Sequence, residues 1–472
     1  MLRVYLAELR DSWSAWLGVS LAFVATNLSF VMSALVLASG WAAVQAGQLD
    51  MMSSAEFTLT PLSNFVFSGI VGLTVVATSA ALVIDSRRGS LARLSVAGAA
   101  PNQILRSVMT QLLVVSIAAA LIADLIAVAA LQPYLHFLTT GVESGTVVQQ
   151  PPAVYHVGYM LVANLACVGV AALGGLGQAR KAATIPPVEA LRQAAASPPQ
   201  RMTGPRWVAV VLGCLILALL FAAIYPLNQE RNSETVSTLM QLGLLALIVF
   251  TQLVAWSAPL LISPLARGWT ALIPVRAPVW QLARKNIYVR GPRFARSVVP
   301  IVFTIALMLG LLSLGPTILA TTTASGYGGD PIRLDKAGMG AFLALLGPAL
   351  GVALCGGIGN LFMMSKQRDA ELALFGITGA TPGQRRLLPV LEAVILTVTA
   401  AIPAIAAMGV MGLYFWLSFN AAGLTPMIEV PLNAWIASIG GTGLIMIAAT
   451  FLPTISAQRL PEPRVIARLA AE

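Results

Sequence analysis

Ten stretches of this chain are long and apolar enough to cross a lipid bilayer. A transmembrane helix needs about 20 predominantly apolar residues, and each stretch approaches or exceeds that length. Hydrophobic residues make up 58% of the chain and charged residues only 10%, against roughly 25% charged in soluble domains. We therefore predict an all-α polytopic membrane protein. The predicted spans are residues 16–43, 65–84, 107–131, 154–173, 207–225, 236–261, 298–320, 338–363, 387–416 and 435–452.

Positive charges are distributed unevenly between the two sides of these spans. The net charge of +10 would suggest a nucleic-acid partner in a soluble protein. With the N-terminus inside, all 28 lysines and arginines except Arg231, Arg333 and Lys336 fall in cytoplasmic segments, whereas the acidic residues outside the spans divide equally. This asymmetry follows the positive-inside rule. The sequence predicts both termini in the cytoplasm and no nucleic-acid partner.

The cytoplasmic stretch 365–392 has a diverged copy at residues 85–111. One constant offset in residue number, 281, aligns the two without gaps. Self-similarity at a fixed offset indicates repeated structure. We interpret it as an internal duplication, with a chance match as the alternative. The matched pairs are Arg87 with Arg368, Leu91 with Leu372, Ala92 with Ala373, Gly98 with Gly379, Ala99 with Ala380, Pro101 with Pro382 and Gln103 with Gln384.

The two copies divide the spans into blocks of four, two and four. Each copy lies between the second and third spans of a four-span unit, and two further spans separate the units. Because every block has an even number of spans, the units enter the membrane in the same orientation. Such parallel repeats are related by a pseudo-twofold axis along the membrane normal. We assign residues 1–200 to the first unit, 201–278 to a two-helix linker unit and 279–472 to the second unit.

No motif for catalysis or cofactor binding stands out. The chain has no GxxxxGK[ST] phosphate-binding loop, and no serine, cysteine or paired-carboxylate arrangement suggests a reaction. His136 and His156 are the only histidines, and both fall in or near one outer loop. They could supply part of a metal site, although we favour solvated loop residues. The sequence predicts a non-catalytic subunit without a metal or cofactor of its own.

Three polar residues in or beside predicted spans are candidates for a functional role. A carboxylate in hydrocarbon costs about 3 kcal/mol on insertion scales and usually faces the interior of a bundle. Asp124 lies toward the outer end of the third span, and Glu392, near the inner end of the ninth, matches Gln111 at the same offset. Glu392 either hydrogen-bonds across the bundle or reaches the headgroups, Arg385 or Arg386. Asp124 is either partly exposed or has a substrate or proton role.

The repeated stretch resembles the signature of the FtsX-like, or MacB-type, ABC transporter permeases. That signature has the form R-x-x-E-x-x-x-x-x-x-x-G-A, followed by a polar turn and a helix that opens with a Glu. The first copy has Ser90 and Gln111 where the family carries acids. The tail after the fourth span also resembles a family motif, with Pro187 followed by an A-L-R sequence that ends at Arg192. In the second copy the matching residues are Arg368, Glu371, Gly379, Ala380, Pro382 and Glu392.

The resemblance implies a function in the bacterial cytoplasmic membrane. In that family the cytoplasmic stretch docks on a separate ABC ATPase, so a chain with two such units would serve an ATPase dimer, and that partner would bind the ATP. The ten spans resemble BceB-type permeases, although residues 321–337 form only a loop where those carry a large extracellular domain. The implied coupling residues are Arg87, Arg368, Glu371, Gly98, Gly379, Pro101, Pro382, Gln103 and Gln384.

Three functions remain open at this point. The first is export or extraction of an amphipathic substrate, such as an antimicrobial peptide, a drug or a membrane lipid. The second is mechanotransmission, in which the permease activates an extracellular partner and no substrate crosses. The third, from another class, is a proton-coupled secondary transporter that uses Asp124 and Glu392.

Overall fold

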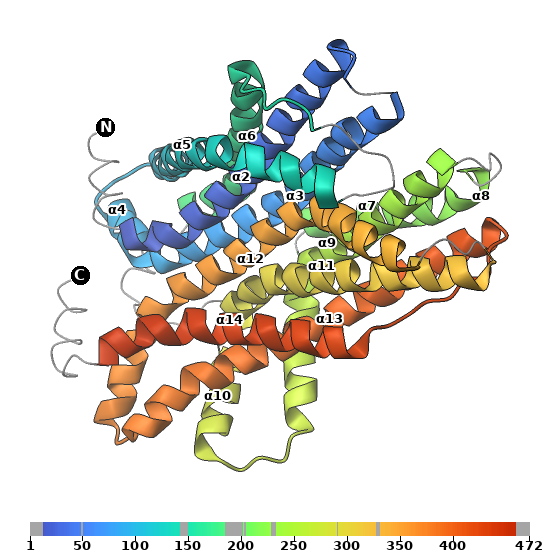
Figure 1. Ribbon diagram of the computed structural model, residues 1–472. Coiled ribbons are helices and arrows are strands. Elements are labelled where there is room, and N and C mark those ends of the chain that lie inside the picture. Colours follow the sequence, from blue (N-terminus) through green and yellow to red (C-terminus); the bar gives the residue numbers. More distant parts are fainter. Residues whose placement is uncertain are drawn as a thin grey trace.

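The fold is described from a computed structural model of the chain. It describes residues 13–48, 51–141, 150–184, 202, 204–227, 233–289, 291–326 and 331–458. Within these ranges every regular element is an α-helix (Figure 1). The helices are α2 (Trp13–Gln45), α3 (Met51–Ser86), α4 (Arg88–Val96), α5 (Pro101–Gly141), α6 (Val157–Ala183), α7 (Gly204–Ala222), α8 (Ile224–Leu227), α9 (Ser233–Ala271), α10 (Pro278–Val289), α11 (Gly291–Ala324), α12 (Pro331–Ile377), α13 (Pro382–Ala421) and α14 (Leu432–Gln458).

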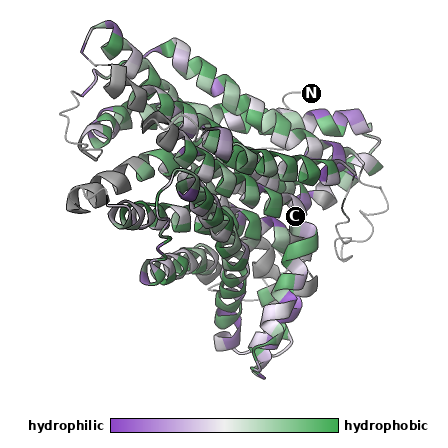
Figure 2. Cartoon of the chain, turned by 90° about the vertical axis from the view of Figure 1, so that its right-hand side faces the viewer, coloured by the Kyte–Doolittle hydropathy of each residue, from purple (hydrophilic) through white to green (hydrophobic). Residues whose placement is uncertain are grey.

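Among the described residues, ten helices are long and apolar enough to span a membrane, which confirms the predicted ten-span, all-α fold. They are all of the helices except α4, α8 and α10. Hydrophobic residues dominate the middle of these helices, and hydrophilic ones gather toward the ends and connecting turns (Figure 2). Some boundaries were wrong: α5 continues to Gly141, so His136 is helical, and α12 begins at Pro331, within the predicted loop 321–337.

The two four-helix units pack in the same way. In the first unit α2 contacts α3, α5 and α6, and α6 also contacts α3 and α5. In the second unit α11 contacts α12, α13 and α14, and α14 also contacts α12 and α13. Replacing α2, α3, α5 and α6 by α11, α12, α13 and α14 therefore reproduces the packing scheme, as the four plus two plus four arrangement requires.

The two units meet where α3 lies beside α12. The hydroxyl of Ser79 on α3 donates to Oδ1 of Asn360 on α12 at 2.7 Å, and these residues are 281 positions apart. Near the other end of the pair, Nδ2 of Asn64 donates to the carbonyl oxygen of Ala344 at 2.8 Å. A direct bond between residues matched by the repeat offset is expected only close to the axis that relates two similar units. The α3–α12 contact thus marks the pseudo-twofold axis.

Different helices pack on the two sides of the α3–α12 pair. On one flank α2 packs directly against α12, and a Cβ on Gly18 would lie 2.2 Å from the carbonyl oxygen of Gly359. On the other flank α9 packs against α11, α13 and α3. Oγ1 of Thr74 on α3 donates there to Gln252 on α9 at 2.5 Å. The linker helix α9 therefore makes the two interfaces unequal.

Candidate functional site

The first glycine turn, residues 97–100, joins α4 to α5. Gly98 has φ +92°, a left-handed conformation that is strained for residues with a Cβ. The backbone N–H of Ala99 donates to the carbonyl oxygen of Leu94 at 3.0 Å, which satisfies a carbonyl at the helix end. Pro101 begins α5, where its fixed φ suits the first turn of a helix. The turn therefore stops one helix and starts the next within four residues.

The second glycine turn, residues 378–381, repeats this geometry between α12 and α13. Gly379 has φ +96°, and the N–H of Ala380 donates to the carbonyl oxygen of Phe375 at 2.8 Å. Pro382 begins α13. Every one of these positions is related to its counterpart by the same constant offset. The alignment made from sequence thus joins residues that have the same backbone conformation and the same hydrogen bond.

The helices that enter the two turns are different. In the second unit α12 runs without a break into its turn. In the first unit α3 ends at Ser86, Arg87 follows with φ −104° and ψ 10°, and α4 then begins. Both turns lie at the same end of the bundle, at the left of Figure 1. The second unit therefore has a continuous helical connection from its turn to the α3–α12 contact, and the first unit does not.

The turns also differ in how they cap the following helix. Oγ1 of Thr381 accepts from the N–H of Gln384 at 3.3 Å, and Oε1 of Gln384 accepts from the N–H of Thr381 at 3.0 Å. In the first turn Oε1 of Gln103 accepts from the N–H of Ala100 at 3.0 Å, but alanine offers no hydroxyl in return. The second turn has a complete capping box, and the first has half of one.

Exchanging these capping residues is expected to change the free energy of unfolding in opposite directions. Thr381→Ala removes the hydroxyl and should lower the free energy of unfolding by about 1 kcal/mol, whereas Ala100→Thr should raise it by up to about 1 kcal/mol. Denaturant unfolding of both variants in detergent measures the effect. A loss of similar size in both variants would contradict the capping assignment.

Arg87 is held inside the first unit. It is 8% exposed, its Nη1 donates to Oε1 of Gln111 on α5 at 2.5 Å, and its guanidinium carbon lies 5.9 Å from the centre of a Trp16 ring on α2. Gln111 in turn donates to Oγ of Ser107 at 3.4 Å. Arg87 thus connects three helices at the point where α3 ends, and it is not presented as a surface charge.

Glu392 is buried in the second unit, at 6% exposure. Its Oε1 accepts from Nδ2 of Asn286 on α10 at 3.2 Å. This contact favours the cross-bundle interpretation over a position at the headgroups. Arg368 and Glu371 lie on α12, but their side chains are outside the described part of the structure.

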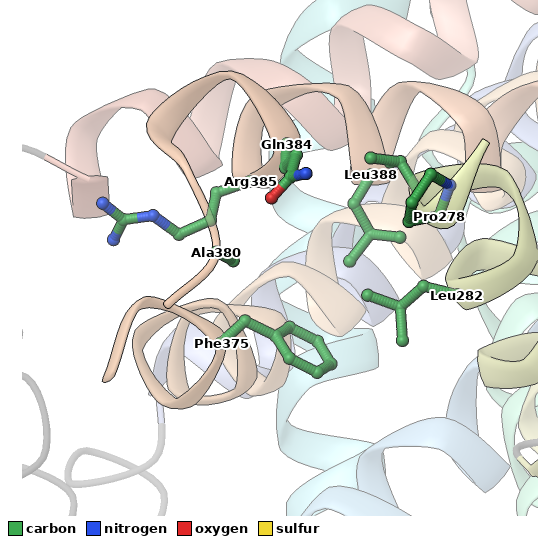
Figure 3. A pocket seen from close by; sticks show the side chains of 8 residues that line it. Pro278, Leu282, Phe375, Ala380, Gln384, Arg385 and Leu388 are labelled. Atoms are coloured by element: carbon green, nitrogen blue, oxygen red, sulfur yellow. The ribbon is translucent and has the colours of Figure 1, made fainter. Parts of the chain in front are cut away.

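A small pocket adjoins the second glycine turn and has a volume of about 80 Å³. Apolar side chains of α10, α12 and α13 face one another across it, and the guanidinium of Arg385 points away from them (Figure 3). Side chains of α10 therefore line the same pocket as residues of the turn region. The lining residues are Pro278, Val279, Leu282, Phe375, Ala380, Gln384, Arg385 and Leu388.

Asp124 belongs to a separate cluster in the first unit. Its Oδ2 accepts from Nδ2 of Asn164 on α6 at 2.9 Å, and Oδ1 of Asn164 accepts from Nδ2 of Asn27 on α2 at 2.8 Å. The contacts of Asp124 are within the first unit and those of Glu392 within the second. The structure thus places the two intramembrane carboxylates in different units with different partners.

His156 has a local role at a helix end. His156 precedes α6, and its Nδ1 accepts from the backbone N–H of Gly158 at 3.2 Å. No group of three metal-ligating side chains occurs in the ranges that the structure describes.

The model of the FtsX-like permease C-terminal family matches the chain twice, at residues 62–187 and at residues 337–460. Together the two matches cover more than half of the chain. The chain belongs to the FtsX-like permease family. No curated protein gives a significant match to it. Each match includes one glycine turn, so this FtsX-like permease has two FtsX-like units in one chain.

Family membership defines the general class of protein. An FtsX-like permease is a membrane subunit of the ABC-transporter type, generally without catalytic activity, and such permeases partner with ABC ATPases. The tail motif at Pro187 and Arg192 lies outside the described residues. Sequence reasoning missed three asparagines: Asn164 and Asn286 donate to Asp124 and Glu392, and Asn27 donates to Asn164. For the two that lie in apolar spans, on α2 and α6, an amide in such a span is itself a signal.

Proposed function

We propose that this FtsX-like permease couples ATP hydrolysis by a separate ATPase dimer to the export or extraction of an amphipathic substrate. The observation that supports this most is the pair of glycine turns at one end of the bundle, which have the same backbone geometry at positions matched by the repeat. Two similar turns suit a partner made of two similar subunits. The permease itself would need no cofactor, because the ATPase binds the ATP.

Orientation and origin form part of the same proposal. The turns face the cytoplasm, as the lysine and arginine distribution indicates, and both termini lie on that side of a bacterial cell membrane. The two units arose by internal duplication, and residues 1–200, 201–278 and 279–472 correspond to the first unit, the linker and the second unit.

Movement at the turns would reach the far side of the membrane through α5 and α13. These helices begin at Pro101 and Pro382 and have 41 and 40 residues, which corresponds to about 60 Å at 1.5 Å per residue. A displacement of either helix start tilts a helix longer than the bilayer is thick. We favour export over mechanotransmission because residues 321–337, where BceB-type permeases carry a large extracellular domain, are too few for an independent domain.

The decisive experiment is purification of the permease together with a candidate ATPase. Glu371→Lys reverses a charge beside the second turn, and the matched Ser90→Lys places the same charge in the first copy. We expect Glu371→Lys to weaken ATPase binding by at least about tenfold, as loss of an interfacial charge pair does, and to abolish stimulation of ATP hydrolysis. Ser90→Lys should have a smaller effect.

Two outcomes would overturn this proposal. One is unchanged ATPase binding and stimulation by a correctly folded Glu371→Lys variant. The other is substrate transport by the purified chain in proteoliposomes without any ATPase, since that is the behaviour of a secondary transporter.

A further inference from the structure

The Asp124 cluster has more hydrogen-bond acceptors than its own donors satisfy. It consists of Asn27 on α2, Asn164 on α6 and Asp124 on α5, joined in a chain of two hydrogen bonds. Among the described residues, Oδ1 of Asp124 and Oδ1 of Asn27 are buried atoms without a hydrogen-bond partner. Asn27 is fully buried, so bulk water does not reach its oxygen. A buried acceptor without a donor costs about 1–3 kcal/mol, and the cluster would therefore be stabilised by a ligand with N–H donors and positive charge.

The cluster lies beside the lipid-facing surface of the first unit. Asp124 is partly exposed, and Leu125 next to it is 75% exposed. On α6, Leu165 follows Asn164 and is 69% exposed. Apolar residues exposed on a membrane-spanning helix contact acyl chains. A ligand that approaches Asp124 from this side therefore needs an apolar body as well as a cationic group.

This acidic position is found in the first unit alone. The repeat offset matches Asp124 to Ile405, on the corresponding helix α13, and Ile405 is also exposed on the helix surface. The glycine turns at the start of α5 and α13 anchor this alignment, because both helices begin at matched prolines. A carboxylate is costly at such a depth, so its presence in one unit indicates a role that the shared fold does not require.

We propose that Asp124, with Asn27 and Asn164, forms a recognition site for the protonated amine of a cationic amphiphile. The amine donates to Oδ1 of Asp124 and to Oδ1 of Asn27, and the apolar body lies against the exposed leucines of α5 and α6. This inference rests on the proposed function for its role in transport and narrows the substrate class to amphiphiles with a primary amine.

Asp124 lies on the helix that starts at the first glycine turn, so movement of the turn would be transmitted to the site. Asp124 follows Pro101 by 23 positions on one continuous helix, or about 35 Å along its axis. Oδ1 of Asp124 is covered in the state described here. Small movements of α5 relative to α6 would uncover that oxygen with or without an ATPase partner, and docking at the turn would bias them. Helix α5 therefore connects the turn on which the ATPase would dock to the site that the ligand would enter.

Binding of dodecylammonium to the full-length permease tests the site without any ATPase. The protein is placed in nanodiscs of phosphatidylglycerol, which has no amine, and bound radiolabelled dodecylammonium is measured with empty nanodiscs as background. We expect Asp124→Asn to weaken binding by about ten- to one-hundredfold, the effect of losing a hydrogen bond to a charged group. Glu429→Gln, which neutralises an exposed carboxylate on the segment between α13 and α14, is the matched control and should leave binding unchanged.

A ligand series on the wild-type protein keeps the proposal testable if Asp124→Asn does not fold. Dodecylammonium should compete with its labelled form at least tenfold better than dodecyltrimethylammonium, which lacks N–H donors, or dodecanol, which lacks charge. Adding phosphatidylethanolamine to the nanodiscs then shows whether a lipid amine occupies the same site. Equal competition by the three amphiphiles, or unchanged binding to a folded Asp124→Asn variant, would overturn the site. Neither result concerns ATPase binding, so the proposed function would stand or fail separately.

Discussion

Replacing Gly359 by alanine is expected to lower the free energy of unfolding by about 3 kcal/mol, the upper end of the usual cost of overpacking. A Cβ at this position would lie 2.4 Å from the carbonyl oxygen of Gly18. The obstacle is backbone, so no side-chain rotation relieves the overlap, and α2 must move away from α12. Since this is the direct contact between the units on that flank, ATPase stimulation should fall as well. Thermal unfolding in detergent and ATPase assays of the complex measure the two effects.

Gly351 provides the matched control on the same helix. A Cβ there meets no atom within 4 Å, and alanine favours a helix over glycine by about 1 kcal/mol. Gly351→Ala should therefore leave the unfolding midpoint unchanged or raise it. If Gly359→Ala behaved like Gly351→Ala, the close approach of α2 and α12 would be contradicted.

Replacing Arg87 by methionine is expected to cost about 2–4 kcal/mol of folding free energy. The buried oxygen of Gln111 loses a charged donor, which costs about 1–3 kcal/mol, and the contact with Trp16 contributes about 1 kcal/mol more. The double variant Arg87→Met/Gln111→Leu removes donor and acceptor together. It should therefore lose less stability than the sum of the single variants, with a coupling energy of at least about 1 kcal/mol in a double-mutant cycle.

Arg93 on α4 is the control for this cycle because it is exposed. Arg93→Met should change stability by less than about 0.5 kcal/mol, as surface substitutions usually do. Additive losses from Arg87→Met and Gln111→Leu would show that their hydrogen bond does not stabilise the first unit. In that case the hydrogen bond from Arg87 to Gln111 would not be what stabilises the break between α3 and α4.

Several features of the fold followed from the sequence because they depend on local chemistry. Ten apolar stretches predicted ten spanning helices, since length and hydrophobicity decide whether a helix suits a bilayer. The constant offset between the two copies predicted that Gly98 and Gly379 have the same role, and both adopt positive φ. A glycine that ends a helix and a proline that begins the next are signals within four residues of chain. They needed no information about distant packing.

Other features could not be read locally. The sequence marked Asp124 and Glu392 as polar residues of interest, but their partners are 40 and 106 positions away. Arg87 was predicted as a coupling residue on the strength of a motif, and the structure shows its side chain inside the first unit. Exposure of a side chain depends on what the neighbouring helices cover, and helix packing in a membrane is decided by shape and small residues more than by hydrophobicity.

By itself, the sequence determined that this chain is a ten-span membrane protein with two glycine turns, because apolar length and turn chemistry are properties of short segments. Its two matches to one family model add that it is an FtsX-like permease with two units. Only the tertiary structure decided how the units meet. It placed Ser79 against Asn360 near the axis, Gly18 against Gly359 on one flank and α9 on the other. Those contacts join residues far apart in the chain, and they form only where small residues let the helix backbones approach closely.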